Sequence, residues 1–181
     1  MSLGSYSFTL AVLVMMLQIV LAVGIVSYFL WREELFRWVT PRRAILASFL
    51  IALISTLGSL AYSKLYGLGV CELCWYQRIA MYPLAVMFGV ALWRSRFDVV
   101  LYALPLSLIG LIISLYHYYL QVQSFFFGKD LAPCSTVGLV PSCSTVQVWE
   151  LGYISIPLMA ASAFAAVAFL SFLMRKNPRV L

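Results

Sequence analysis

Cys71-Glu72-Leu73-Cys74-Trp75-Tyr76-Gln77-Arg78 is the stretch around which the rest of the 181-residue chain is organised. The uncharged run that follows it, Ile79 to Trp93, has only 15 residues. At about 1.5 Å per residue this run reaches about 22 Å, which is short of a hydrocarbon layer of about 30 Å. The helix must therefore begin earlier, at about Leu73 to Trp75. This start places the Cys-x-x-Cys pair in the first turn of a transmembrane helix, at the membrane surface.

The composition of the chain indicates an integral membrane protein. Hydrophobic residues make up 64% of the sequence and charged residues 10%, whereas a soluble domain carries about 25% charged residues. A core of this size cannot bury so much apolar surface, so the excess must face lipid. The net charge of +6 does not predict a nucleic-acid partner, because the basic residues lie in short loops between apolar spans.

Five apolar spans predict an all-α membrane protein. The first span is predicted to be a retained helix and not a cleaved signal peptide, because no basic residue precedes it and its apolar run is too long. Pro41 is well placed as the first residue of the second helix. The predicted spans are about Tyr6 to Trp31, Ala44 to Tyr66, Leu73 to Trp93, Val99 to Gln121 and Tyr153 to Met174.

Ser55, Ser59 and Ser63 repeat every four residues and therefore share one face of the second span. Small residues at this spacing let helices approach closely in lipid. Helix packing is therefore the favoured interpretation of this face, and a ligand groove is the alternative.

The distribution of basic residues predicts the orientation in the membrane. Five spans place the two termini on opposite sides, and nine of the twelve basic residues share the side of the C-terminus. Because cytoplasmic loops carry the excess of Lys and Arg, the C-terminus is predicted to be cytoplasmic. The N-terminus and both cysteine loops then lie outside a bacterial cytoplasmic (inner) membrane, in an oxidising compartment.

The first cysteine pair, Cys71 and Cys74, is suited to redox chemistry. The dipole and unpaired amides of a helix N-terminus stabilise a thiolate. Arg78 lies four residues after Cys74, on the same helical face and one turn deeper. Its guanidinium is expected to stabilise the thiolate or an anionic electron acceptor, and an interfacial anchor that snorkels to the headgroups is the alternative. A static disulfide across so short a loop would contribute little.

The second pair, Cys134 and Cys143, lies in a polar loop of roughly residues 122–152 with turn-forming Pro and Gly. A labile disulfide open to exchange is favoured over a structural one. A zinc site with four thiolate ligands is disfavoured because the spacing is wide and no His is near the pairs in sequence, so no metal is predicted. Two redox pairs on one face imply a relay, and sulfurs at membrane depth point to a lipid-soluble acceptor such as a quinone.

The residues around both pairs resemble one family. The stretch from Cys71 to Ile79, followed by Met81-Tyr82-Pro83-Leu84, closely resembles the signature of the DsbB/BdbC family of membrane disulfide-bond formation proteins. The segment from Pro141 to Pro157 resembles that family's segment leading into its last helix. The resemblance implies a four-helix bundle over residues 44–174. Residues 1–43 would then be an extra N-terminal transmembrane helix and cytoplasmic loop, and residues 175–181 a basic cytoplasmic tail.

The resemblance also implies a function. The expected activity is that of a quinone-dependent protein-dithiol oxidase, with ubiquinone or menaquinone as cofactor. It would reoxidise a thioredoxin-fold thiol oxidase of the DsbA type on the non-cytoplasmic side. Disulfide-bond formation in exported proteins would depend on this reoxidation.

The resemblance implies roles for single residues as well. Cys134 and Cys143 would face the partner, with Cys134 forming the mixed disulfide. Cys71 would receive electrons from that loop pair, and Cys74 would face the quinone beside Arg78. His117, the one histidine in the sequence, is predicted to lie level with the cysteines. It could lie near the quinone or belong to an interfacial aromatic belt, and these two alternatives are equally favoured.

Three other functions compete with this interpretation. A quinone reductase of the vitamin K epoxide reductase type is disfavoured by the Trp-Tyr-Gln-Arg continuation after Cys74. A membrane carrier of reductant would need cysteines on both sides of the membrane. A non-catalytic membrane protein with static disulfides is the third. The spacing of the loop pair resembles BdbC-like members, and the sequence leaves open the quinone type, the partner, the resting pairing and the role of the first helix.

Overall fold

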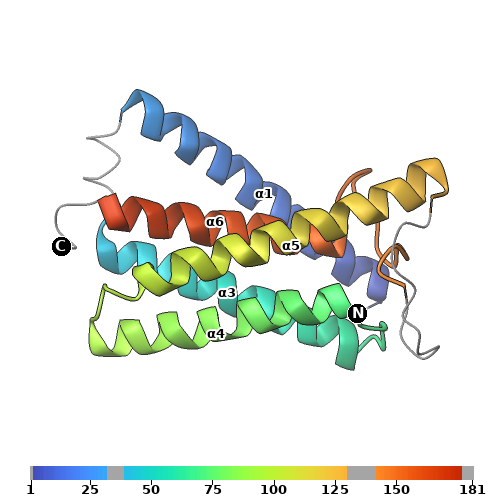
Figure 1. Ribbon diagram of the computed structural model, residues 1–181, viewed down its shortest axis with the longest axis horizontal. Helices are drawn as coiled ribbons and strands as arrows, with labels where there is room; N and C mark the ends of the chain where they lie inside the picture. The colour runs from blue at the N-terminus through green and yellow to red at the C-terminus, as the bar shows by residue number, and fades with distance from the viewer. Residues whose placement is uncertain (1, 32–38, 130–141, 177–181) are drawn as a thin grey trace.

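The computed structural model describes residues 2–31, 39–129 and 142–176, and confirms the all-α membrane fold. An isolated antiparallel bridge between Glu150 and Ile154 is the only β pairing within those ranges. The helices, labelled as in Figure 1, are α1 (Leu3–Leu30), α3 (Pro41–Lys64), α4 (Glu72–Arg94), α5 (Val100–Phe127) and α6 (Ile156–Lys176).

The helix ends follow local sequence signals. Pro41 is the first residue of α3, as predicted, because its fixed φ suits the helix start and the N–H it lacks would have no partner there. Cys71 is the N-cap of α4 and Cys74 lies in the first turn. α5 continues to Phe127, past the end predicted at about Gln121, and stops at Gly128, whose left-handed φ of 61° favours glycine.

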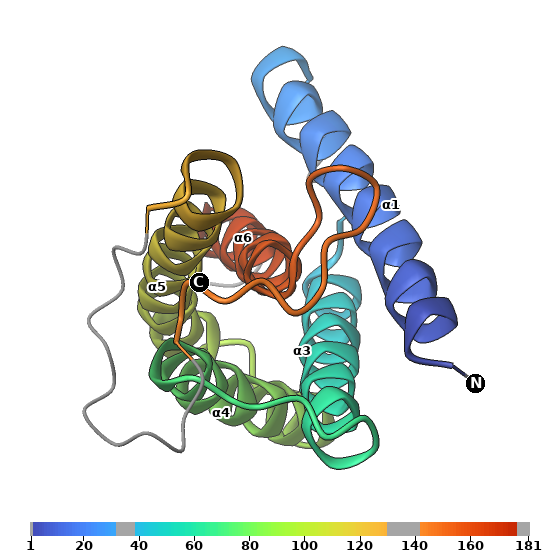
Figure 2. The same cartoon turned by 90° about the vertical axis from the view of Figure 1, so that its right-hand side faces the viewer.

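Helices α3, α4, α5 and α6 form a four-helix bundle, each packed against two neighbours in the order α3, α4, α5, α6 and back to α3 (Figure 2). Its core contains the fully buried side chains of Leu84, Phe88 and Phe164. α5 and α6 pack closely because Gly110 faces the ring of Phe164, where a Cβ would overlap ring atoms. α1 lies outside this bundle and crosses it obliquely against α6.

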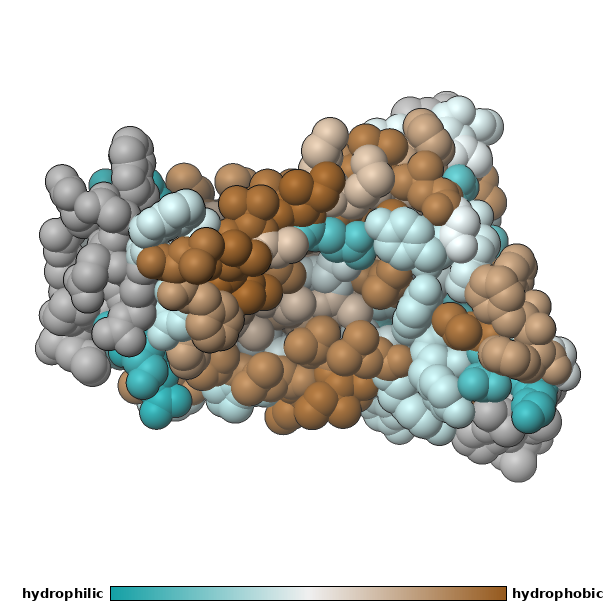
Figure 3. All heavy atoms as spheres, turned by 90° about the horizontal axis from the view of Figure 1, so that it is seen from above, coloured by the Kyte–Doolittle hydropathy of each residue, from teal (hydrophilic) through white to brown (hydrophobic). Residues whose placement is uncertain are grey.

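The surface of the helices suits a lipid environment. In the described part of the chain, α1, α3, α5 and α6 are long and apolar enough to cross a membrane. α4 is not among them, because Gln77 and Arg78 lower the hydropathy of its first turns, but at 23 residues it runs beside α3 and α5. On the face shown in Figure 3, apolar side chains gather over the middle of the bundle, and paler, more polar ones lie toward the right-hand end.

The cysteine-bearing segments gather at one end of the bundle. The N-termini of α1, α4 and α6 lie there together with the C-termini of α3 and α5, at the right of Figure 1. The opposite end carries Arg94 in the last turn of α4, Arg96 just after it, and Arg175 and Lys176 in the last turn of α6. The two ends therefore differ in charge in the sense that the sequence predicts.

Candidate redox site

The sulfurs of Cys71 and Cys74 lie 3.4 Å apart at the start of α4. This separation exceeds a disulfide bond length of about 2.05 Å, so both residues are thiols here. Cys71 is buried, with 4% of its surface exposed. The local cause of the arrangement is the helix start, because the N-cap and the third residue of the first turn bring the two side chains to the same end of α4.

Cys143 reaches this pair because its loop is docked on the extended end of α5. Trp149 stacks on Phe125 with ring centroids 4.6 Å apart and on Tyr118 at 6.3 Å. Gln121 donates a hydrogen bond from Nε2 to the carbonyl oxygen of Thr145 over 3.2 Å. The last turns of α5, on both sides of the end predicted at about Gln121, therefore position the segment that carries Cys143.

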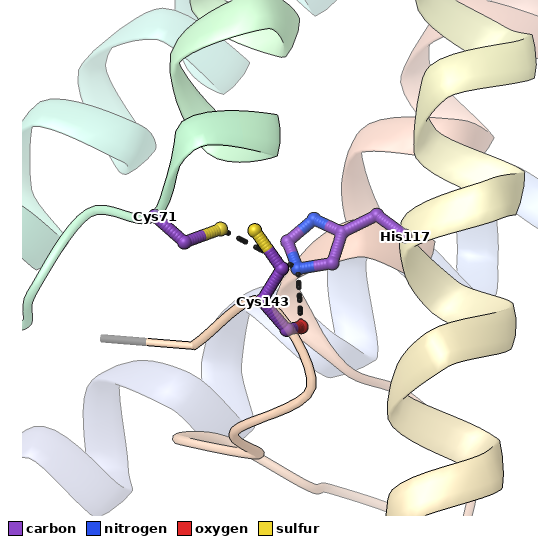
Figure 4. A group of neighbouring side chains, drawn as sticks. All are labelled: Cys71, His117 and Cys143. Atoms are coloured by element: carbon purple, nitrogen blue, oxygen red, sulfur yellow. Dashed lines mark hydrogen bonds between the residues drawn. The ribbon is translucent and has the colours of Figure 1, made fainter. Parts of the chain in front are cut away.

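Cys71 lies close to both Cys74 and Cys143. Its Sγ, the Sγ of Cys143 and a ring nitrogen of His117 all lie within 4.8 Å of one another (Figure 4), and the Sγ of Cys74 is 3.4 Å from that of Cys71. The three groups in Figure 4 come from the start of α4, from α5 and from the loop after it. A thiol with one sulfur neighbour in the membrane helix and another in the loop can exchange disulfide bonds with either.

The thiols outside the membrane helices have raised pKa values. For Cys71, the hydrogen bond with Cys143 lowers the pKa, but the hydrogen bond with Cys74 and burial raise it by more, to about 11. The hydrogen bond with Cys71, followed by burial, raises the pKa of Cys143 well above the usual thiol range. In the dithiol state both groups are therefore protonated at neutral pH.

His117 is part of this site and not of an aromatic belt. Its side chain is 1% exposed, so the belt alternative is wrong. Nε2 lies 3.1 Å from the carbonyl oxygen of Cys143 and 3.7 Å from Sγ of Cys71, and Nδ1 lies 3.1 Å from Nε2 of Gln77. A carbonyl oxygen only accepts and an amide NH₂ only donates, so Nε2 carries the hydrogen and Nδ1 accepts.

One sequence argument against a metal site is also wrong. No His is near the cysteines in sequence, yet the fold brings His117 to Cys71 and Cys143, and these donors have the chemistry of a zinc ligand set. The nitrogen that faces the sulfurs donates its hydrogen to the carbonyl oxygen of Cys143. A metal ion would have to displace that hydrogen bond, so the arrangement suits thiol exchange better.

A cavity of about 300 Å³ lies beside Cys74, lined by α1, α3, α4, α6 and loop residues. Cys74 and Arg78 contribute to its wall, whereas Cys71 and His117 do not. A much smaller cleft of about 20 Å³ lies beside Cys71, Cys74 and His117. His117, predicted as a candidate for the quinone site, thus lies beside the sulfurs and away from the large cavity.

Arg78 is held in the cavity wall by α3. Its Nε donates to Oγ of Ser59 and a terminal nitrogen donates to the carbonyl oxygen of Ser59, each over 2.8 Å. The guanidinium carbon also lies 5.6 Å from the centroid of the Trp75 ring. These contacts fix a permanent positive charge one helical turn from Cys74, where a snorkelling anchor would be directed to the headgroups.

The serine face of α3 is the cavity wall. Ser55, Ser59 and Ser63 all line the cavity, so this face borders an open space and is not the closely packed helix surface that was favoured; a ligand groove on it stays a prediction. Small side chains at every fourth position leave the space that a larger residue would fill.

Several residues of the site were not singled out from the sequence. Gln77 forms a hydrogen bond with His117 and also lines the cavity. The sequence signal that could have identified it is its place in the Trp-Tyr-Gln-Arg stretch after Cys74. The contribution of α1 to the cavity had no sequence signal. Cys134, predicted to form the mixed disulfide, lies outside the described residues.

The fold and the site together define a class of protein. The chain is a multi-pass helical membrane protein with a dithiol between a second cysteine and an apolar cavity. Residues 41–174 match the family model described as "Disulfide bond formation protein DsbB". The chain therefore belongs to that family, and its class is that of a membrane disulfide oxidoreductase.

Individual relatives agree with this assignment. The chain is 41% identical over 129 residues to "Disulfide bond formation protein C" of Bacillus subtilis, an alignment that covers 71% of this chain and 90% of that protein. It is 37% identical over 134 residues to "Probable disulfide formation protein C" of Bacillus cereus, covering 74% and 93%. A "Probable disulfide formation protein" of Metapseudomonas resinovorans is 37% identical over 133 residues, covering 74% and 90%. No solved structure matches the chain.

Proposed function

We propose that this protein is a thiol:quinone oxidoreductase that reoxidises a DsbA-like thioredoxin-fold protein. The observation that carries the proposal is the position of Cys71, which has both Cys143 and Cys74 as sulfur neighbours, while Cys74 also lines the cavity. Electrons from a protein dithiol can reach the cavity through two exchanges between neighbouring sulfurs.

The first exchange takes place between the partner and the loop. The partner's two thiols reduce a Cys134–Cys143 disulfide through a mixed disulfide with Cys134, which leaves the partner oxidised and both loop cysteines as thiols. Two electrons have then moved from the partner to the loop pair, and the partner carries the new disulfide. Cys134 stands in this role by its position in sequence.

The second exchange takes place between the loop and α4. The Cys143 thiolate attacks Cys71 of a Cys71–Cys74 disulfide, so the Cys71–Cys143 bond forms and Cys74 leaves as a thiolate. Cys134 then attacks Cys143, the Cys134–Cys143 bond is restored, and Cys71 leaves as a thiol. The loop pair is oxidised again and the two electrons rest on Cys71 and Cys74.

His117 and Arg78 assist different stages of this sequence. The Nε2–H of His117 lies beside both Sγ of Cys71 and the carbonyl oxygen of Cys143, so it holds the loop at the attacking distance and faces negative charge on Cys71. Arg78 faces the cavity next to Cys74 and stabilises negative charge that develops there.

The cavity fits a quinone by size and chemistry. Ligand sites are mostly apolar pockets of about 300–1,000 Å³ with a few polar groups, and here Cys74, Arg78 and Ser59 are among the polar groups of a mainly apolar lining. A bound quinone would supply the oxidant, because its reduction takes two electrons and two protons from the dithiol and restores the Cys71–Cys74 bond. The residues that would hold it are Arg78 and the apolar side chains opposite.

The orientation follows from charge. We place the end with the cysteines on the outer side of a bacterial cytoplasmic membrane and the end with Arg94, Arg96, Arg175 and Lys176 in the cytoplasm. A membrane-impermeant thiol reagent added to intact cells should then label reduced Cys134. Labelling of Cys134 only after lysis would reverse this orientation.

The function is tested with the purified protein. The protein is reduced, the reductant is removed, and free thiols are counted over time with and without added ubiquinone or menaquinone. We expect four thiols to fall to none in the presence of quinone, and much more slowly without it. Equal rates in the two samples would exclude quinone-linked oxidation and favour a protein with static disulfides.

A further inference from the structure

α1 lies outside the segment that matches the family model, which begins at residue 41, yet it forms part of the cavity wall. Leu10, Leu13, Val14 and Leu17 line the cavity. Their spacing of three, four and seven residues places all four on one face of the helix. This face is directed toward the space beside Cys74 and Arg78.

Hydrogen bonds fix this part of α1 to the bundle. Tyr6 donates from its hydroxyl to the carbonyl oxygen of Gly58 over 3.3 Å, and the Tyr62 hydroxyl donates to Oγ of Ser7 over 3.3 Å. Gln18 donates from Nε2 to Oγ of Ser162 in α6 over 2.8 Å. The cavity-lining turns lie between these anchors, so the wall that they form is held in place at both ends.

The position of these anchors shows which part of the cavity α1 covers. Tyr6 meets α3 at Gly58, next to Ser59, which binds Arg78. α1 runs from there away from the cysteine end of the bundle, so Leu13 and Leu17 lie two to three turns farther from that end than Tyr6 does. The neighbouring lining in this deeper part is mainly apolar: it includes Ile51 and Ile54 of α3 and Phe164 of α6, together with Ser55 and Tyr82.

We propose that α1 binds the isoprenoid tail of the quinone, and that Leu13, Val14 and Leu17 form the tail-binding wall of the cavity. This inference rests on the proposed function. The polar end of the cavity, at Arg78, Ser59 and Cys74, receives the quinone ring. At the deeper end, α1 contributes only apolar side chains. These match the chemistry of a hydrocarbon chain and cannot form a hydrogen bond with an oxygen of the quinone ring.

The test uses two tryptophan variants of the full-length protein in lipid nanodiscs. Leu13→Trp adds bulk at the cavity wall, and Ile19→Trp adds the same bulk on α1 away from it. The two positions are a matched pair, because their exposed fractions are 54% and 53% and only Leu13 lines the cavity. Equilibrium binding is measured with a benzoquinone that carries a ten-carbon tail and with the same ring without a tail.

We expect Leu13→Trp to weaken binding of the tailed quinone about tenfold and to leave binding of the tail-less ring unchanged. Ile19→Trp should change neither affinity. A quinone with a photoreactive group at the end of its tail gives a second measurement, since it should label wild-type residues 10–17 in a way that excess unlabelled quinone prevents.

The results separate the two proposals. If the wild type binds both quinones saturably, but the two variants have equal affinities and the photolabel is confined to α3, α4 and α6, the role of α1 is excluded and the proposed function stands. If the wild type binds neither quinone saturably, the proposed function fails, and the role of α1 fails with it.

Discussion

The two sides of the Cys71–Cys74 pair are built differently. Cys71 borders a cleft of about 20 Å³, which Cys74, His117 and residues of the Cys143 loop also line. On the side of Cys74 there is a largely apolar cavity of about 300 Å³ with one guanidinium in its wall. The first side has the space and the sulfur for exchange with a protein thiol, and the second has the volume for a lipid-soluble molecule.

This difference explains how one dithiol can serve two unlike reactants. A thiol exchange needs three sulfurs close together and little else, so a tight cleft is sufficient. A two-electron transfer to an apolar acceptor needs space, exclusion of water and a fixed charge near the reacting atoms. If the division is correct, single substitutions should impair one side and leave the other intact.

The largest effect is expected for Cys74→Ser. Quinone-dependent turnover should fall below about one thousandth of the wild-type rate, because no Cys71–Cys74 disulfide can form. The exchange on the other side should persist, since Cys71 can still attack Cys143 of an oxidised loop pair. We therefore expect a Cys71–Cys143 disulfide to accumulate, as measured by mass spectrometry of peptides from a non-reducing digest.

Cys71→Ser is the matched control for this experiment. It should abolish turnover equally but leave Cys74 as an unpaired thiol and the loop pair bonded to itself. A Cys71–Cys134 bond in Cys74→Ser would show that the other loop cysteine delivers the electrons, and the division drawn here would be wrong on the thiol side.

A smaller effect, confined to the cavity side, is expected for Arg78→Gln. Removing one positioned donor of this kind costs about 10²- to 10³-fold in rate in other enzymes, and we expect quinone reduction to fall about 100-fold. The rate of quinone reduction in Arg78→Lys should lie between the rates of wild type and Arg78→Gln, because lysine keeps the charge but lacks the planar guanidinium that holds Ser59 with two hydrogen bonds. Stopped-flow measurement of quinone absorbance gives these rates.

The control for Arg78 is the rate at which a reduced loop pair transfers electrons to Cys71. This rate is measured by rapid acid quench and thiol alkylation without quinone, and should be the same in Arg78→Gln and wild type. An equal loss of both rates would mean that Arg78 supports the start of α4 as a whole and has no separate role in the cavity.

How much of this arrangement is visible in the sequence depends on the range of the interactions. The dithiol at the start of α4 and Arg78 one turn later are fixed by helix geometry over eight residues, and hydropathy locates the helices. Both features were therefore predicted. Neither prediction required knowledge of which helices pack against each other.

The remaining features depend on contacts between distant segments. His117 is 46 residues from Cys71 and 26 from Cys143, and the end of α5 that docks the Cys143 loop looks in sequence like an aromatic stretch at a membrane interface. The serines of α3 have the same spacing whether they face a helix or a cavity. Nothing in an apolar run such as residues 10–17 tells a ligand wall from a lipid-facing surface, because both favour the same side chains.

The smallest effect is expected for His117→Phe, on the side of Cys71. Phenylalanine fills a similar volume but cannot donate to the carbonyl oxygen of Cys143, a bond of 3.1 Å. One hydrogen bond contributes about 0.5–1.5 kcal/mol, so transfer from Cys143 to Cys71 should slow by about 3- to 10-fold.

Binding of quinone and the rate of its reduction by a prereduced Cys71–Cys74 pair should not change in this variant, because His117 does not line the cavity. Tyr116→Phe is the control on the same turn of α5, with a half-exposed side chain outside the cleft.

The pH dependence of Cys71 alkylation adds a separate readout for His117. The pKa of the Cys71 thiol, about 11 in the dithiol state, predicts that its alkylation by iodoacetamide accelerates about tenfold per pH unit from pH 8 to 10. Loss of the His117 donor beside that sulfur should disfavour the thiolate and move this profile to higher pH, whereas a purely structural role for His117 would expose Cys71 and move it toward an ordinary thiol, to lower pH.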